Sequence, residues 1–200
     1  MKKILVSILA ASLMLVGTSA YAQFSVGAGY VNSKNTYTTS GSHKYSAPSN
    51  GFYAGAEYNV PVGDIFGLSA GVNFEYLMSK DYSLAGLISG NFKEMFLNVP
   101  VHLNFGVDVA DALRVSIFAG PTFSYGLSSK VEVAGVSVDV YDKFGWNRFD
   151  VLVGGGAGLE LMNKVRLTVG YDLGMFNHLP EDSNDKLNRN RLHAGVAFRC

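Results

Sequence analysis

Residues 95–105, with the sequence MFLNVPVHLNF, decide the fold class. Apolar side chains occupy every second position: Met95, Leu97, Val99, Val101, Leu103 and Phe105. The positions between them are mostly polar: Phe96, Asn98, Pro100, His102 and Asn104. Because successive side chains of a strand point to opposite faces, this period predicts a β-strand with one apolar and one polar face. The segment also has the length, about 9–11 residues, that a strand needs to cross a membrane.

Seven further segments alternate in the same way, at residues 24–31, 52–60, 66–78, 113–125, 149–161, 165–175 and 191–199. Short connections (61–64, 106–112, 162–164) alternate with long polar ones (32–51, 79–94, 126–148, 176–190). Short turns at one end and long extracellular loops at the other are typical of outer-membrane barrels. We therefore predict an all-β fold, an eight-stranded antiparallel transmembrane up-and-down β-barrel of the cell outer membrane. Both termini would then lie on the periplasmic side.

The residue types on the two faces of the predicted strands indicate whether the barrel lies in a membrane or in water. A soluble barrel carries many charged residues on its polar face. Here every lysine after residue 22 falls in a predicted loop or turn: Lys34, Lys44, Lys80, Lys93, Lys130, Lys143, Lys164 and Lys186. Aromatic residues gather at the strand ends, as in membrane girdles: Phe24, Tyr58, Phe66, Phe105 and Phe198 at one end, and Tyr30, Phe52, Phe74, Tyr76, Phe123, Tyr125, Phe149 and Tyr171 at the other. We expect the apolar faces to meet lipid.

The first 22 residues have the pattern of a cleaved signal peptide. Lys2 and Lys3 precede an apolar stretch at residues 4–16, and Ala20-Tyr21-Ala22 is an A-x-A cleavage site. We predict a leader at 1–22 and a barrel domain at 23–200. Cys200 is the only cysteine, so it forms no internal disulfide, and the sequence leaves its role open.

Composition and residue spacing argue against several kinds of binding site. The formal net charge is +0, which argues against a nucleic-acid partner. The four histidines show no metal-ligand spacing, and the Gly154-Gly155-Gly156-Ala157-Gly158 run lies inside a predicted strand, where it forms no phosphate loop. We expect neither a cofactor nor a metal.

Charged and histidine residues on the predicted inward faces form the candidate site: Glu57, Glu75, His102, Arg114, Asp150, Glu160, Arg166, Asp172, Arg191, His193 and Arg199. A turn centred on Asn163 would place Glu160 opposite Arg166. Since buried charges are normally paired, we interpret the set as a salt-bridge network that plugs the lumen. The alternative is a narrow, porin-like path for ions or small solutes. An eight-stranded barrel has room only for its own side chains, which argues against a large pore.

Two groups of loop residues are candidates for catalysis: His43 with Ser42, Tyr45 and Ser46, and His178 with Glu181, Asp182 and Ser183. Barrel enzymes that modify lipid A use such residues, so this activity is a second alternative. Neither spacing is diagnostic, and we predict that the protein is not an enzyme.

The long loops are the predicted site of function, in adhesion or surface binding. Residues 131–141 (VEVAGVSVDVY) alternate around Gly135 and could form a protruding ribbon that recruits partners by strand addition. Trp146 is expected to anchor at the membrane interface. The predicted partners are outer-membrane lipid and lipopolysaccharide, with a possible extracellular protein or glycan, and the barrel is expected to be a monomer.

Four segments resemble successive strands of the PorT-like outer-membrane β-barrel proteins common in Bacteroidetes: FLNVPVHLNF (96–105), FAGPTFSYGL (118–127), RFDVLVGGGAGLEL (148–161) and RLTVGYDLGMFN (166–177). The Val99-Pro100 and Gly120-Pro121 units are their most particular marks. The resemblance implies an eight-stranded outer-membrane barrel and supplies no catalytic residues. Such barrels commonly end on an aromatic residue, whereas here Arg199 and Cys200 follow Phe198.

Overall fold

The structure, a computed structural model, describes residues 23–39, 43–84, 88–133, 136–179 and 185–200, so the predicted leader lies outside it. The described residues form one sheet and a short helix: β1 (Gln23–Thr38), β2 (Lys44–Val62), β3 (Phe66–Leu84), β4 (Ile88–Ala110), β5 (Leu113–Val133), β6 (Val136–Asp139), α2 (Val140–Phe144), β7 (Phe149–Leu161), β8 (Val165–Gly174) and β9 (Lys186–Arg199). Among these residues, no helix has the length and apolar character needed to cross a membrane.

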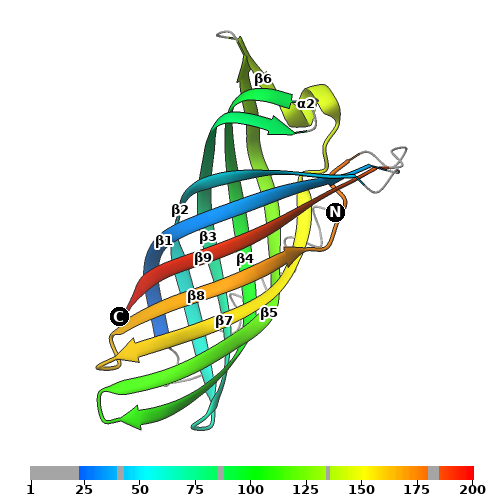
Figure 1. The fold of residues 1–200 in the computed structure, drawn as a ribbon. Helices are drawn as coiled ribbons and strands as arrows, with labels where there is room; N and C mark the ends of the chain where they lie inside the picture. Colours follow the sequence, from blue (N-terminus) through cyan, green and yellow to red (C-terminus); the bar gives the residue numbers. More distant parts are fainter. Residues whose placement is uncertain (1–22, 40–42, 85–87, 134–135, 180–184) are drawn as a thin grey trace, which may run out of the picture.

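Eight of the strands close into a ring in the order β1-β2-β3-β4-β5-β7-β8-β9, and every neighbouring pair is antiparallel. The ring closes between β1 and β9, where the amide of Cys200 donates to the carbonyl of Phe24 at 2.9 Å. Strand β6 lies outside the ring and pairs only with β5 among the described strands (Figure 1). The predicted eight-stranded up-and-down barrel is therefore confirmed.

The barrel buries its polar face and exposes its apolar face. In the segment that predicts the fold, Leu97 and Leu103 are exposed, whereas Asn98 and His102 are buried. Aromatic rings pair at both ends of this apolar band: Phe66 contacts Phe105, with centroids 5.5 Å apart, and Phe52 contacts Tyr76 at 5.6 Å. This inverted burial is the arrangement that a hydrocarbon solvent requires.

One end of the barrel, which we call the turn end, carries the tight hairpin turns (Figure 1). Met162 and Asn163 both have positive φ, 52° and 56°, which matches the twist of a tight hairpin. The resulting register sets Glu160 against Arg166, as the sequence predicts, and also sets Gly154 against Asp172.

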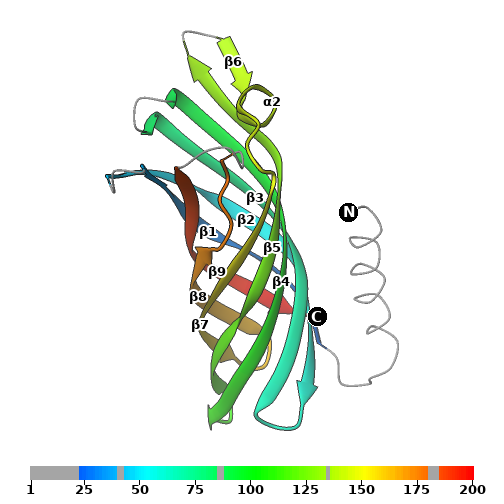
Figure 2. The same ribbon diagram turned by 90° about the vertical axis from the view of Figure 1, so that its right-hand side faces the viewer.

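At the opposite end, the prediction of long loops was wrong for most of their length. Strand β1 continues to Thr38, β3 to Leu84 and β5 to Val133, and these continuations rise beyond the ring (Figures 1 and 2). Six of the lysines predicted to lie in loops therefore lie in strands: Lys34, Lys44, Lys80, Lys93, Lys130 and Lys186. A strand in water needs no apolar outer face, so these segments keep their hydrogen-bonded ladders without the alternation that reveals a strand in the sequence.

The predicted ribbon at residues 131–141 is present in part. Strands β5 and β6 pair from Lys130 opposite Asp139 to Val133 opposite Val136, and the predicted turn at Gly135 lies outside the described residues. The strand then ends earlier than predicted, because the Asp139 side chain accepts from the Tyr141 amide at 2.9 Å and caps α2. We call the continuations of β3, β4 and β5, with β6 and α2, the extension.

Candidate functional site

The interior is filled by layers of ion pairs, beginning near the turn end. Arg166 of β8 contacts Glu57 of β2 at 2.8 Å and Glu160 of β7 at 3.7 Å. Arg199 of β9 also pairs with Glu160, with Nη2 and Oε2 2.6 Å apart. These four residues come from four strands, so the contacts tie the wall together across the lumen.

Below this layer the barrel opens toward the turn end in a vestibule of about 760 Å³. Arg114 lies on its wall, where it pairs with Asp108 at 3.0 Å and donates to the carbonyls of Asp64 and Gly106. Arg114 was predicted to belong to the lumen network, but the contacts described above are with the turns at the mouth. Its function there is to hold two hairpins together.

The middle of the lumen contains a cavity of about 130 Å³ that is lined by both polar and apolar side chains. The rings of His102 and His193 lie on either side of Phe118, with centroid distances of 5.2 and 6.2 Å. His193 also faces Asp172 at 3.4 Å. His102 Nε2 and Asp172 Oδ1 are buried and form no hydrogen bond with another described residue. A cavity of this size and polarity has room for several waters.

Arg191 of β9 forms the next layer. Its guanidinium contacts Glu75 at 2.9 Å, Asn98 at 2.9 Å and Ser124 at 3.1 Å, on three different strands. Asn98 in turn donates to Glu75 at 2.5 Å. Each of these side chains is buried, and together they occupy the cross-section between the cavity and the extension.

Another arginine layer, which was not predicted from the sequence, lies between the Arg191 layer and the extension. Arg189 donates to Glu94 at 2.6 Å and to Asn35 at 2.9 Å. The ring of Phe96 lies between the two arginines, with the guanidinium carbons of Arg189 and Arg191 at 4.5 and 4.7 Å from its centroid. Glu94 and Arg189 both fall in segments predicted to be loops, so the sequence did not predict that their side chains lie in the lumen.

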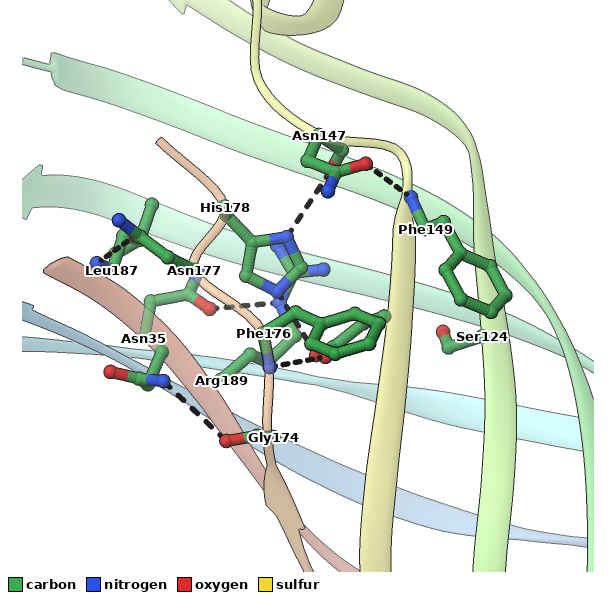
Figure 3. A network of polar contacts seen from close by, with 12 residues as sticks. Asn35, Ser124, Asn147, Phe149, Gly174, Phe176, Asn177, His178, Leu187 and Arg189 are labelled. Atoms are coloured by element: carbon green, nitrogen blue, oxygen red, sulfur yellow. Dashed lines mark hydrogen bonds and ion pairs between the residues drawn. The ribbon is translucent and has the colours of Figure 1, made fainter. Parts of the chain in front are cut away.

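His178 and Asp150 also make a buried contact, and Figure 3 shows His178 with its neighbours Asn147 and Phe176. His178 Nε2 lies 3.0 Å from Asp150 Oδ2, and its Nδ1 lies 3.2 Å from the carbonyl oxygen of Asn147. Asp150 also accepts from the amide of Phe176 at 3.1 Å. Both imidazole nitrogens therefore lie within hydrogen-bond distance of oxygen atoms. They fix the segment after β8 against β7.

The structure also shows where His43 and His178, from the two groups of candidate catalytic residues, lie in the fold. The side chain of His178 is 3% exposed and faces the lumen residue Asp150, while its proposed partners Glu181, Asp182 and Ser183 lie outside the described residues. His43 is exposed at the tip of the β1–β2 hairpin with Tyr45 and Ser46, and Ser42 lies outside the described residues. Among the described residues, no group of three or more metal-ligating side chains could hold an ion.

An apolar cluster, which we call the cap, covers the arginine layers at the end away from the turns. Its buried members are Tyr37, Ala47, Phe92, Val131, Val140, Tyr141, Trp146 and Leu187. Trp146 is 8% exposed, so its predicted place at the membrane interface was wrong. Burial raises the pKa of Tyr141 to about 12. Helix α2 supplies two of these residues, which explains why the chain turns back at Asp139 over the lumen.

A closed ring with an apolar outer band, aromatic girdles and a charged interior defines a β-barrel of the outer membrane. The chain belongs to the family described as outer membrane protein beta-barrel domain, whose model matches residues 17–179. The cell outer membrane is therefore its location. Because such barrels carry short turns on the periplasmic side and longer segments outside, we expect the turn end to be periplasmic and the extension to be extracellular.

This chain is similar to solved structures that include an attachment protein, a surface protein and an outer membrane enzyme. Ail of Yersinia pestis is 16% identical over 90% of this chain and 99% of its own, with a TM-score of 0.48. Neisserial surface protein A is 16% identical over 88% and 97%, with a TM-score of 0.48. The outer membrane enzyme PagL is 12% identical over 84% and 97%, with a TM-score of 0.44. A search of curated proteins gave no match.

Proposed function

We propose that this protein is a non-conducting surface protein whose extension binds a protein or glycan outside the cell, in adhesion or surface attachment. The observation that carries the proposal is the extension itself, an ordered sheet that continues well beyond the barrel ring (Figure 2). Ordered backbone ladders present side chains in fixed positions, which lowers the entropic cost of binding.

The outer face of the extension offers polar groups for recognition. Lys93 pairs with Glu132 at 3.6 Å, and both side chains are about half exposed. Lys130 lies directly opposite Lys93 on one side and Asp139 on the other. Strand β6 has no second neighbour among the described strands, so its outer edge is available for pairing with an added strand.

The filled lumen argues against the channel alternative. Ions crossing the barrel would have to separate the Arg189–Glu94 and Arg191–Glu75 pairs and displace the cap. The enzyme alternative is weakened by the burial of His178, which keeps its ring from lipid. We expect no enzymatic activity. A PorT-like relationship and a monomeric state remain parts of the proposal that rest on the sequence.

The test compares two variants with equal charge change. The extension variant is Lys93→Gln/Lys130→Gln/Lys143→Gln, and the rim variant is Lys34→Gln/Lys44→Gln/Lys186→Gln. Each is displayed on a non-adherent Gram-negative host, and attachment to immobilised matrix proteins and glycans is counted. We expect the wild type to attach, the extension variant to lose attachment several-fold, and the rim variant to keep it. Attachment equal to that of empty cells on every surface would overturn the proposal.

A further inference from the structure

A second polar surface lies on the other side of the rim, where β2, β1 and β9 continue beyond the aromatic girdle. We call it the basic face. The register aligns its outward residues in four rows across the three strands: Asn50, Asn32 and Leu192; Pro48, Lys34 and Asn190; Ser46, Thr36 and Asn188; and Lys44, Thr38 and Lys186. At about 3.4 Å per residue, successive rows are roughly 7 Å apart.

The basic face carries charge of one sign. Lys34, Lys44 and Lys186 are exposed, and none of its outward positions holds an aspartate or glutamate. Among the described residues, no salt bridge involves these three lysines. The nearest acid in sequence, Asp185, accepts instead from the hydroxyl of Tyr37 in the cap. The described part of the face therefore carries positive charge that pairs with no described acid.

The extension shows that this charge pattern is not general to the rim. There Lys93 pairs with Glu132, Arg148 pairs with Asp142 at 3.1 Å, and Lys130 lies opposite Asp139. Acids and bases alternate on that side, whereas the basic face offers lysines among amides and hydroxyls. A polyanion should therefore bind the basic face more strongly than the extension.

The polar side chains of the basic face are held in place from the membrane side. Asn50 accepts from Asn32 at 2.8 Å and from the hydroxyl of Tyr30, a residue of the girdle. The hydroxyls of Thr36 and Ser46, two rows farther from the membrane, are 3.2 Å apart. Hydroxyls and amides fixed in this way form an ordered polar ladder that starts at the aromatic belt.

The ladder begins where lipid headgroups lie. Tyr30 and Phe52 are exposed just below it on β1 and β2, and Leu192 is exposed in its first row on β9, so lipid chains packed on these side chains bring their headgroups to the first rows. From this position and charge we infer that the basic face binds the phosphorylated sugar headgroup of an outer-leaflet glycolipid. The lysines would contact its phosphates, and Asn32, Asn50 and Ser46 its hydroxyls. The inference is independent of the proposed function, because it uses the other side of the rim.

The test measures lipid retained on the full barrel. Wild type, the rim variant and the extension variant are reconstituted with phosphatidylglycerol and bisphosphorylated lipid A, and bound lipid is counted by native mass spectrometry. We expect wild type and the extension variant to retain lipid A over phosphatidylglycerol, and the rim variant to lose at least about threefold of that preference. Gel shift on heating checks that each variant is folded.

Two further measurements complete the test. Dephosphorylated lipid A should be retained no better than phosphatidylglycerol, and retention of lipid A by the wild type should fall as salt rises. Equal retention by wild type and rim variant, or equal retention of the dephosphorylated lipid, would overturn the inference. So would binding of a soluble anionic polysaccharide without retention of lipid A, since it would assign the face to an external polymer.

Discussion

Arg189 of β9 and Glu94 of β4 form an ion pair of 2.6 Å in which the side chains are 2% and 0% exposed. The two residues lie 95 positions apart in the chain and on strands that are not neighbours in the ring. Their contact therefore crosses the lumen. It lies directly under the cap, and with the Arg191–Glu75 pair it fills the lumen between the central cavity and the cap with buried polar side chains.

This pair should contribute strongly to stability. Glu94→Gln leaves the Arg189 guanidinium without its carboxylate in a buried site, which costs about 3–5 kcal/mol for comparable pairs. The neighbouring Lys93→Gln breaks an exposed pair and should cost less than about 1 kcal/mol. Urea unfolding of the reconstituted barrel measures both free energies. Equal losses in the two variants would contradict a structural role for the lumen pair.

The tight approach of β7 to β8 makes a second prediction. A Cβ built on Gly156 would lie 2.1 Å from the Val169 carbonyl oxygen and 2.6 Å from the Phe118 ring. Gly156→Ala should therefore lower the free energy of unfolding by about 1–3 kcal/mol. At Gly67 the nearest atom is the side-chain Asn59 Oδ1 at 3.0 Å, so Gly67→Ala serves as the tolerant control. Unfolding midpoints that move equally would refute this account.

The single tryptophan reports on the cap. Because Trp146 is packed with Phe92, Val140 and Leu187, its emission should be blue-shifted and resistant to acrylamide. Brominated lipids should not quench it, since the cap lies beyond the bilayer. Phe92→Ala should open the cluster and restore acrylamide quenching. Strong quenching of the wild type by brominated lipid would place Trp146 at the interface after all.

Alkaline titration tests the same cluster. The pKa of Tyr141 is raised from 10.0 to about 12 in the folded protein by burial, so the unfolded state loses this proton first. The contribution of the neutral phenol to stability is complete below pH 10 and is lost as pH rises toward 12. The difference in unfolding free energy between wild type and Tyr141→Phe should change in this window alone. A difference independent of pH from 9 to about 12 would contradict the burial of Tyr141.

The sequence predicted the parts of the barrel that lipid constrains. Alternation at residues 95–105 revealed the strand and its faces, and the turn at Asn163 gave the register of Glu160 and Arg166. Beyond the girdle, residues such as Lys34 and Thr36 lie in strands without an apolar face, so their pattern was that of loops. The Arg189–Glu94 pair was missed for this reason. Its partners also depend on the stagger of strands around the ring, which a local pattern does not encode.

Planar-bilayer conductance of the refolded barrel tests the central claim most directly, because the claim is that ion pairs and the cap close the lumen. We predict that the wild type shows no steady openings across the voltage range that the bilayer tolerates. Arg189→Ala/Glu94→Ala with Phe92→Ala, which removes the upper layer and opens the cap, should show more frequent openings. Stable, ion-selective openings of the wild-type barrel would contradict the account and assign the charged layers to a conducting path.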